Sequence, residues 1–160
     1  MTPTVGIRCV VNGKTIEDSV EPRTSLVDYL RHGVGLTGTH VGCEQGVCGM
    51  CTVLVDGVAA KSCLMLAPQA DGHEIRTIES VAPGEELHPL QEALRDHHGL
   101  QCGYCTPGFV MTALALKDSG AACDEATLRA ELSGNLCRCT GYQNIVTAVA
   151  EFLGVEEHPA

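Results

Sequence analysis

The sequence has few aromatic residues and few basic ones. Its 160 residues include two phenylalanines, three tyrosines and no tryptophan, and ten lysines and arginines stand against twenty aspartates and glutamates. The resulting net charge of −10 argues against nucleic-acid binding, because phosphate backbones require a basic surface. With so few large rings and eighteen glycines, a small domain buries little apolar area and needs another source of stability.

Long hydrophobic runs and targeting signals are also missing. The longest apolar stretch, Gly108 to Leu116, is too short to cross a bilayer, so we expect no direct membrane insertion. The first residues, MTPTVGIRCV, lack the basic start and apolar core of a signal peptide. We therefore expect a cytoplasmic protein, in which disulfides rarely persist.

Cysteine, by contrast, is abundant, with ten residues. In a reducing compartment, cysteines gathered in groups indicate metal ligands rather than disulfides. Eight of them form two groups, which are Cys43, Cys48, Cys51 and Cys63, and Cys102, Cys105, Cys137 and Cys139. The other two, Cys9 and Cys123, fit neither group and are predicted to be ordinary buried thiols.

The first group has the spacing C-x4-C-x2-C, and eleven residues separate Cys51 from Cys63. This is the plant-type ferredoxin pattern for a [2Fe–2S] cluster. The glycines of the loop, including Gly46 and Gly49, allow backbone N–H groups to point at cluster sulfurs and stabilise their negative charge. Two zinc sites are the alternative, although zinc usually takes C-x2-C pairs and fits the x4 spacing and the C-x-C pair poorly.

Residues 1–80 are predicted to form a small sheet crossed by one helix. Asn12-Gly13 and Asp56-Gly57 are hairpin signals, and Thr24 or Ser25 can cap a helix that ends at Gly33. The predicted strands are 5–11, 15–20, 52–55, 58–61 and 73–78, and the predicted helix begins at Leu26. Strands and a helix in this order indicate an α+β domain, which we interpret as a β-grasp of the plant-ferredoxin type.

Residues 81–160 are predicted to form an all-α domain of four helices. Pro83-Gly84 marks the boundary, after which apolar residues repeat at helical spacing. The predicted helices cover about 87–98, 106–117, 125–132 and 141–153, with Thr106, Asp124 and Thr140 as caps of the last three. The pairs Cys102/Cys105 and Cys137/Cys139 would then each lie at a helix N-terminus, whose dipole favours an anionic cluster.

Four segments carry a resemblance to a known family. They are GCEQGVCGMCTVLVDG at 42–57, SCLMLA at 62–67, QCGYCTPGFVM at 101–111 and LSGNLCRCTGYQNIV at 132–146. Together they resemble the small iron–sulfur subunit of molybdenum hydroxylases, such as xanthine dehydrogenase, aldehyde oxidoreductase and carbon monoxide dehydrogenase. The resemblance covers nearly the whole chain and implies a ferredoxin-like domain and a four-helix domain with one [2Fe–2S] cluster each.

The resemblance also implies a function and partners. The chain would be an electron-transfer subunit that passes electrons from a molybdopterin centre on a large subunit, through its two clusters, to FAD on a medium subunit. A heterotrimer or its dimer is expected, and Gln101 and Cys139 would lie near the molybdopterin. The chain itself would hold no catalytic centre. A free-standing two-cluster ferredoxin and a zinc-stabilised adaptor are the alternatives.

A few residues depart from the family pattern or suggest other sites. Met50, His40 and Tyr104 stand where the family often has alanine, lysine and phenylalanine, and none of them replaces a cysteine. His97-His98 is interpreted as a surface pair at a helix end rather than as a Rieske ligand pair, because no cysteine is missing. Gly33 to Gly38 matches G-x-G-x-x-G but follows a helix, which excludes a dinucleotide fingerprint.

Overall fold

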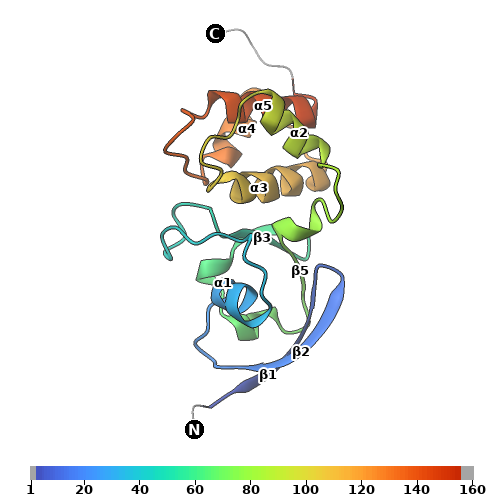
Figure 1. Cartoon of the computed structure of the whole chain (residues 1–160), viewed down its shortest axis with the longest axis vertical. Helices are drawn as coiled ribbons and strands as arrows, with labels where there is room; N and C mark the ends of the chain where they lie inside the picture. Colours follow the sequence, from blue (N-terminus) through green and yellow to red (C-terminus); the bar gives the residue numbers. More distant parts are fainter. Residues whose placement is uncertain (1–2, 156–160) are drawn as a thin grey trace.

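A mixed β-sheet occupies one half of the molecule and helices occupy the other (Figure 1). The computed structural model describes residues 3–155. The strands in this range are β1 (Val5–Val11), β2 (Lys14–Val20), β3 (Thr52–Val55), β4 (Val58–Lys61) and β5 (Glu74–Arg76). Their order is β2-β1-β5-β3-β4, with β1 and β5 parallel and the other neighbours antiparallel. The predicted α+β class is confirmed.

Two tight hairpins form the outer strand pairs, as predicted. Asn12 and Gly13 have φ values of 50° and 77°, and Asp56 and Gly57 have 49° and 83°. Positive φ at both central residues is the mark of a type I′ turn, whose twist matches that of the flanking strands. The hairpin signals in the sequence therefore located β1 to β4 to within one residue.

The strand predicted over 73–78 is shorter than expected. The strand ends with β5 at Arg76, because the side chain of Asn12 forms hydrogen bonds with the next residue, Thr77. Asn12 Oδ1 accepts a hydrogen bond from the backbone N–H of Thr77 over 2.8 Å, and Asn12 Nδ2 donates to Thr77 Oγ1 over 2.9 Å. A short 3₁₀ turn, Ile78–Ser80, follows.

One short helix, α1 (Leu26–Asp28), packs on the sheet and continues as a π-helical turn to Gly33. Ser25 caps it, since its Oγ accepts a hydrogen bond from Asp28 N over 3.1 Å. Apolar side chains from α1 and the strands form the first core, which contains Ile7, Cys9, Val11, Val20, Leu26, Tyr29, Leu30, Val53, Ala67, Ala70 and Ile75. Cys9 is therefore a buried thiol, as predicted.

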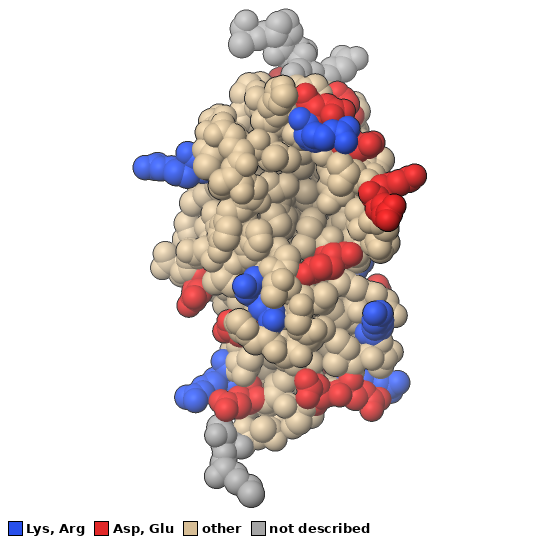
Figure 2. All heavy atoms as spheres, in the orientation of Figure 1, with Lys and Arg blue, Asp and Glu red and all other residues tan. Residues whose placement is uncertain are grey.

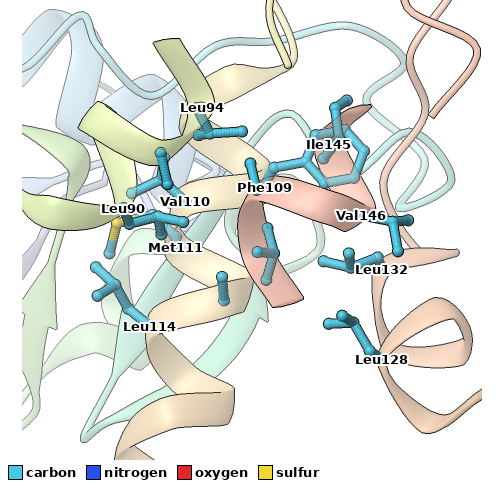
Figure 3. Packing of buried hydrophobic residues seen from close by; sticks show 14 of the residues in the cluster. Leu90, Leu94, Phe109, Val110, Met111, Leu114, Leu128, Leu132, Ile145 and Val146 are labelled. Atoms are coloured by element: carbon cyan, nitrogen blue, oxygen red, sulfur yellow. The ribbon is translucent and has the colours of Figure 1, made fainter. Parts of the chain in front are cut away.

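The second half contains α2 (Pro89–Asp96), α3 (Thr106–Ser119), α4 (Glu125–Leu132) and α5 (Gln143–Leu153). Their apolar faces meet around Phe109, which is 1% exposed (Figure 3). Leu54 of β3 belongs to this second core as well, so the sheet and the helices share buried surface. No helix within residues 3–155 is long and apolar enough to span a membrane.

Several predicted helix boundaries are wrong by one or two residues. The cap of α3 is Cys105 rather than Thr106, and α5 begins at Gln143 behind Tyr142, not behind Thr140. Leu87 lies outside α2, because His88 caps that helix and Pro89 opens it.

Two smaller predictions have mixed outcomes. His97 is the C-terminal cap of α2, as expected for a helix-end histidine, but its Nε2 also lies 2.6 Å from Glu151 Oε2 of α5. Cys123 is only half-buried, so the prediction of a buried thiol there is wrong.

Charged side chains are scattered over the surface. On the face in Figure 2, lysines and arginines are interspersed with acidic residues and with a large uncharged area, and they form no continuous basic patch there. This distribution agrees with the acidic net charge.

Candidate metal centres

The first cysteine group lies on the loop before β3 and on the turn after β4. Thr52 pairs with Lys61 across the β3–β4 hairpin, which places Ser62 beside Cys51. Ser62 Oγ donates to the backbone oxygen of Cys51 over 2.6 Å. Cys63 follows directly, and its thiol hydrogen-bonds to the thiol of Cys51. The hairpin thus joins two cysteines that are twelve positions apart.

Backbone N–H groups in the loop converge on Cys43. The N–H of Cys48 donates to Cys43 Sγ over 3.4 Å. Together with the N–H of Gln45, it lowers the pKa of the Cys43 thiol to about 7. Gly46 and Gly49 have φ values of 79° and 74°, the left-handed region that glycine occupies without strain. The loop therefore stabilises negative charge on the sulfur of Cys43, whereas burial raises the pKa of Cys48 and raises that of Cys63 to about 11.

The second group also consists of contacting thiols. The Sγ atoms of Cys102 and Cys139 lie 3.5 Å apart, and the thiol of Cys105 hydrogen-bonds to that of Cys137. Burial and this hydrogen bond raise the pKa of Cys105 to about 12. Cys105 and Cys137 are buried, whereas Cys102 and Cys139 are exposed. One side of this group therefore faces the protein and the other faces outward.

Each group of four thus consists of two close pairs. The first group contains the thiol pairs Cys43/Cys48 and Cys51/Cys63, and the second contains Cys102/Cys139 and Cys105/Cys137. No set of three or more His, Cys, Asp or Glu side chains in the described part of the chain is arranged to hold one metal ion. A [2Fe–2S] cluster has two irons with two ligands each, so paired thiols fit it.

Only one cysteine of the second group lies at a helix N-terminus. Cys105 caps the 14-residue α3, as expected, but Cys137 and Cys139 lie on an irregular segment before α5. There Thr140 Oγ1 donates to Cys137 Sγ over 3.2 Å, and the Tyr142 hydroxyl accepts the N–H of Cys137 over 3.0 Å. The prediction of two equivalent helix ends is therefore wrong.

Tyr142 is a site residue that sequence reasoning missed. Its φ of 71° is a rare conformation for an aromatic residue and marks a constrained position. In this backbone conformation the Tyr142 hydroxyl accepts the hydrogen bond from the N–H of Cys137. Its place in the run Cys-Arg-Cys-Thr-Gly-Tyr, directly after a glycine and before the helical pattern, was the available signal.

Gln101 and Cys139, the two residues expected to contact a partner's cofactor, are both exposed. Arg138, between Cys137 and Cys139, is exposed as well. Nearby apolar side chains are also exposed, among them Leu100, Tyr104 and Leu136. The outer side of the second group thus combines thiols, an amide and apolar surface.

Comparison with known proteins shows which family contains chains with these two cysteine groups. Residues 9–77 match the model of a 2Fe-2S iron-sulfur cluster binding domain, and residues 77–150 match that of a [2Fe-2S] binding domain. The chain is 54% identical over 146 residues to caffeine dehydrogenase subunit gamma of Pseudomonas sp. (strain CBB1), covering 89% of this chain and 87% of that one. It is 45% identical over 150 residues to the xanthine dehydrogenase iron-sulfur-binding subunit of Escherichia coli O157:H7, covering 92% and 94%.

The solved structures give the same result. Quinoline 2-oxidoreductase from Pseudomonas putida 86 contains a chain that superposes with a TM-score of 0.87 at 49% identity, with 94% of this chain and 96% of that chain covered. This chain belongs to the small iron–sulfur subunits of the molybdenum hydroxylase family. As a member of that family it is an electron-transfer subunit of an oxidoreductase and has two [2Fe–2S] domains.

Two departures from the family pattern, His40 and Tyr104, contact one another. Their rings stack with centroids 4.5 Å apart and planes 13° apart. His40 Nδ1 lies 2.8 Å from the backbone oxygen of Tyr104 and must donate, because a carbonyl oxygen only accepts. The Tyr104 hydroxyl donates to Val41 O over 2.8 Å. The pair therefore links the first cysteine loop to the second cysteine group.

A hydrogen bond between backbones connects the two cysteine groups of this iron–sulfur subunit directly. The N–H of Leu136 donates to the carbonyl oxygen of Cys48 over 2.8 Å. Leu136 precedes Cys137, so the bond runs from one cysteine to the neighbour of another. Figure 1 shows the two loops on the same side of the molecule.

Asn135 and Lys61 surround this connection. Asn135 is 2% exposed, its Nδ2 lies 3.5 Å from Gly49 O, and its Oδ1 accepts from Thr112 Oγ1 over 3.2 Å. Lys61 Nζ donates to the same Oδ1 over 3.2 Å. Burial lowers the pKa of the Lys61 ammonium, and attraction to the thiolates of the first cysteine group opposes that effect.

Proposed function

We propose that the eight grouped cysteines ligate the two clusters. Cys43, Cys48, Cys51 and Cys63 would hold the first, and Cys102, Cys105, Cys137 and Cys139 the second. The observation that carries this assignment is the arrangement of each group as two contacting thiol pairs. The domain division at residue 80 stays a prediction, supported by the two apolar cores. So does the arrangement as a β-grasp followed by a four-helix domain.

When bound, such clusters accept and release single electrons. The contribution of this chain is to hold the ligands at fixed places and to supply donors to sulfur. The N–H groups around Cys43 and the hydroxyl of Thr140 do so. The bond between Leu136 and Cys48 couples the two ligand sets through the backbone. These features support a path from a molybdopterin centre through the second site and then the first to FAD.

The partners are proposed to be a large molybdopterin-binding subunit and a medium FAD-binding subunit, in a cytoplasmic heterotrimer or its dimer. Exposed Gln101 and Cys139 would face the molybdopterin, and the exposed apolar residues around them would be covered by the large subunit. This surface favours a subunit over a free-standing ferredoxin, which would leave it in water.

Cys43→Ser and Cys102→Ser in the purified complex test the ligand assignment. Each should weaken or remove the EPR signal of one cluster, and the two should affect different signals. About four irons per chain are expected in the unmodified protein and would exclude zinc. Loss of both signals in equal measure in each variant would contradict two separate sites.

Gln101→Ala tests whether Gln101 contributes to electron transfer from the molybdopterin centre to FAD. Reduction of FAD by substrate should slow while the melting temperature and both EPR signals persist, because Gln101 is exposed and lies outside both cores. Unchanged FAD reduction would remove Gln101 from the path. Purification of the chain alone, as a monomer with both clusters, would favour the free ferredoxin.

A further inference from the structure

Among the described residues, Lys61 is the only lysine whose ammonium donates hydrogen bonds to both halves of the chain. It is the last residue of β4, and its Nζ donates to Thr52 Oγ1 over 3.0 Å, to Gly134 O over 3.2 Å and to Asn135 Oδ1 over 3.2 Å. All three acceptors are uncharged. Between residues 3 and 155, no carboxylate lies within 4.0 Å of the Lys61 ammonium.

Lys61 lies against the first site, since it pairs across the hairpin with Thr52, the residue after Cys51, and is two residues before Cys63. Cys51, Cys48, Cys63 and Cys43 interact with its ammonium, in decreasing order. On the side of the second site, its acceptors Gly134 and Asn135 lie three and two residues before Cys137. Lys61 is half-buried, where water screens a charge less than it does on an exposed side chain. The ammonium is thus a positive charge held directly beside Thr52, the neighbour of the first-site ligand Cys51.

We propose that Lys61 sets the difference in reduction potential between the two sites, so that an electron favours the first. This inference rests on the proposed function, because it takes both groups as cluster ligands. In the step concerned, one electron leaves the second site, which is oxidised, and one electron enters the first, which is reduced. No bond forms or breaks, and no proton moves. The added negative charge is stabilised by the nearby ammonium.

The hydrogen bonds of Lys61 keep this charge in place. Thr52 holds the ammonium from the sheet, and Gly134 and Asn135 hold it from the segment before Cys137. A lysine free in solvent would spread its charge over many positions. Here the residues that join the two halves also orient the cation.

The test is a redox titration of the complex, with each cluster followed by its EPR signal. Lys61→Gln should make reduction of the first cluster about tenfold less favourable, which is about 59 mV for one electron, and should leave the second cluster unchanged. Lys61→Arg keeps the charge and should retain most of the original difference. Lys14→Gln is the matched control, because it removes the same charge from the exposed hairpin of β1 and β2 and should shift neither potential.

Equal shifts in both clusters, or no shift in the first, would overturn the proposal. If Lys61→Gln does not fold, Lys61→Met provides a neutral variant with a long apolar stem, and the same two outcomes apply. Iron content and the presence of both signals report the integrity of the sites. Absence of two cluster signals from the unmodified complex would instead refute the proposed function.

Discussion

Tyr29 has the largest pKa shift in the first core outside the cysteine groups. It is 4% exposed, and burial, the charge of Asp18 and a hydrogen bond of 3.2 Å to Asp18 Oδ2 raise its pKa to about 12. Because the folded-state pKa lies above the ordinary value near 10, the stabilisation is complete below pH 10. It is lost as the pH rises toward 12.

We therefore expect the free energy of unfolding to fall by roughly 2 to 3 kcal/mol between about pH 10 and pH 12. Chemical denaturation across this range measures the effect, and tyrosinate absorbance should show a late component near pH 12 from Tyr29. Tyr29→Phe is the control, since it should remove both the late titration and this part of the alkaline loss. The same alkaline slope in Tyr29→Phe would contradict the assignment.

His40 and Tyr104 provide a second prediction for single residues. Because their rings stack and each donates a hydrogen bond toward the other's segment, the effects of replacing both should not add. A double-mutant cycle with His40→Ala and Tyr104→Ala should give a coupling of about 0.5–1.5 kcal/mol. Coupling near zero would mean that the two departures from the family pattern are independent.

Among the secondary-structure elements, α3 approaches the loop before β3 closely, across the boundary between the halves. A Cβ at Gly108 of α3 would collide with the backbone oxygen of Gly49 and lie 2.9 Å from Asn135 Nδ2. Neither the loop backbone nor the buried Asn135 can move freely. The close approach therefore requires glycine on the helix.

Gly108→Ala should lower the free energy of unfolding by about 1–3 kcal/mol, because forced separation outweighs the gain in helix propensity. Thermal unfolding of this chain after its purification from the complex measures the change in the free energy of unfolding. Gly6→Ala is the matched control. Gly6 lies on β1, no atom lies within 4 Å of the Cβ that alanine would add, and its φ is ordinary, so the free energy of unfolding should hardly change. A Gly108→Ala variant as stable as the parent would contradict the packing argument.

Elements defined by local signals could be predicted from the sequence, and elements defined by distant contacts could not. Asn12-Gly13 predicts its hairpin because the turn conformation depends on those two residues. The end of β5 depends on the side chain of Asn12, sixty-five positions away from Thr77, and no local pattern contains that information. The start of α5 depends on the unusual backbone of Tyr142.

The candidate sites follow the same rule. The short spacings within C-x4-C-x2-C, C-x2-C and C-x-C, together with the resemblance to the family, assign the cysteines to two groups. Which thiols pair within the second group depends on the fold, which brings Cys102 to Cys139 and Cys105 to Cys137. Lys61 has no signal in the sequence, since its role comes from a hairpin register and from residues 134 and 135.

For the molecule as a whole, the cysteine groups are expected to contribute to stability. Removal of iron by chelation should lower the melting temperature, because the loop around Gly46 would lose its attachment to the first cluster and the segment before α5 its attachment to the second. The helical core around Phe109 is apolar, so most of the far-UV circular dichroism should persist at moderate temperature. Reconstitution with iron and sulfide should restore the original melting temperature, whereas an unchanged melting temperature after iron removal would refute the expectation.

The bond from Leu136 N to Cys48 O has an evolutionary consequence. Both of its atoms are main-chain atoms, so nineteen of the twenty amino acids at position 136 would supply the same donor, and any residue at position 48 supplies the acceptor. Proline alone lacks the N–H group. The side chain at position 136 can consequently change to any residue except proline without loss of the hydrogen bond that connects the two sites.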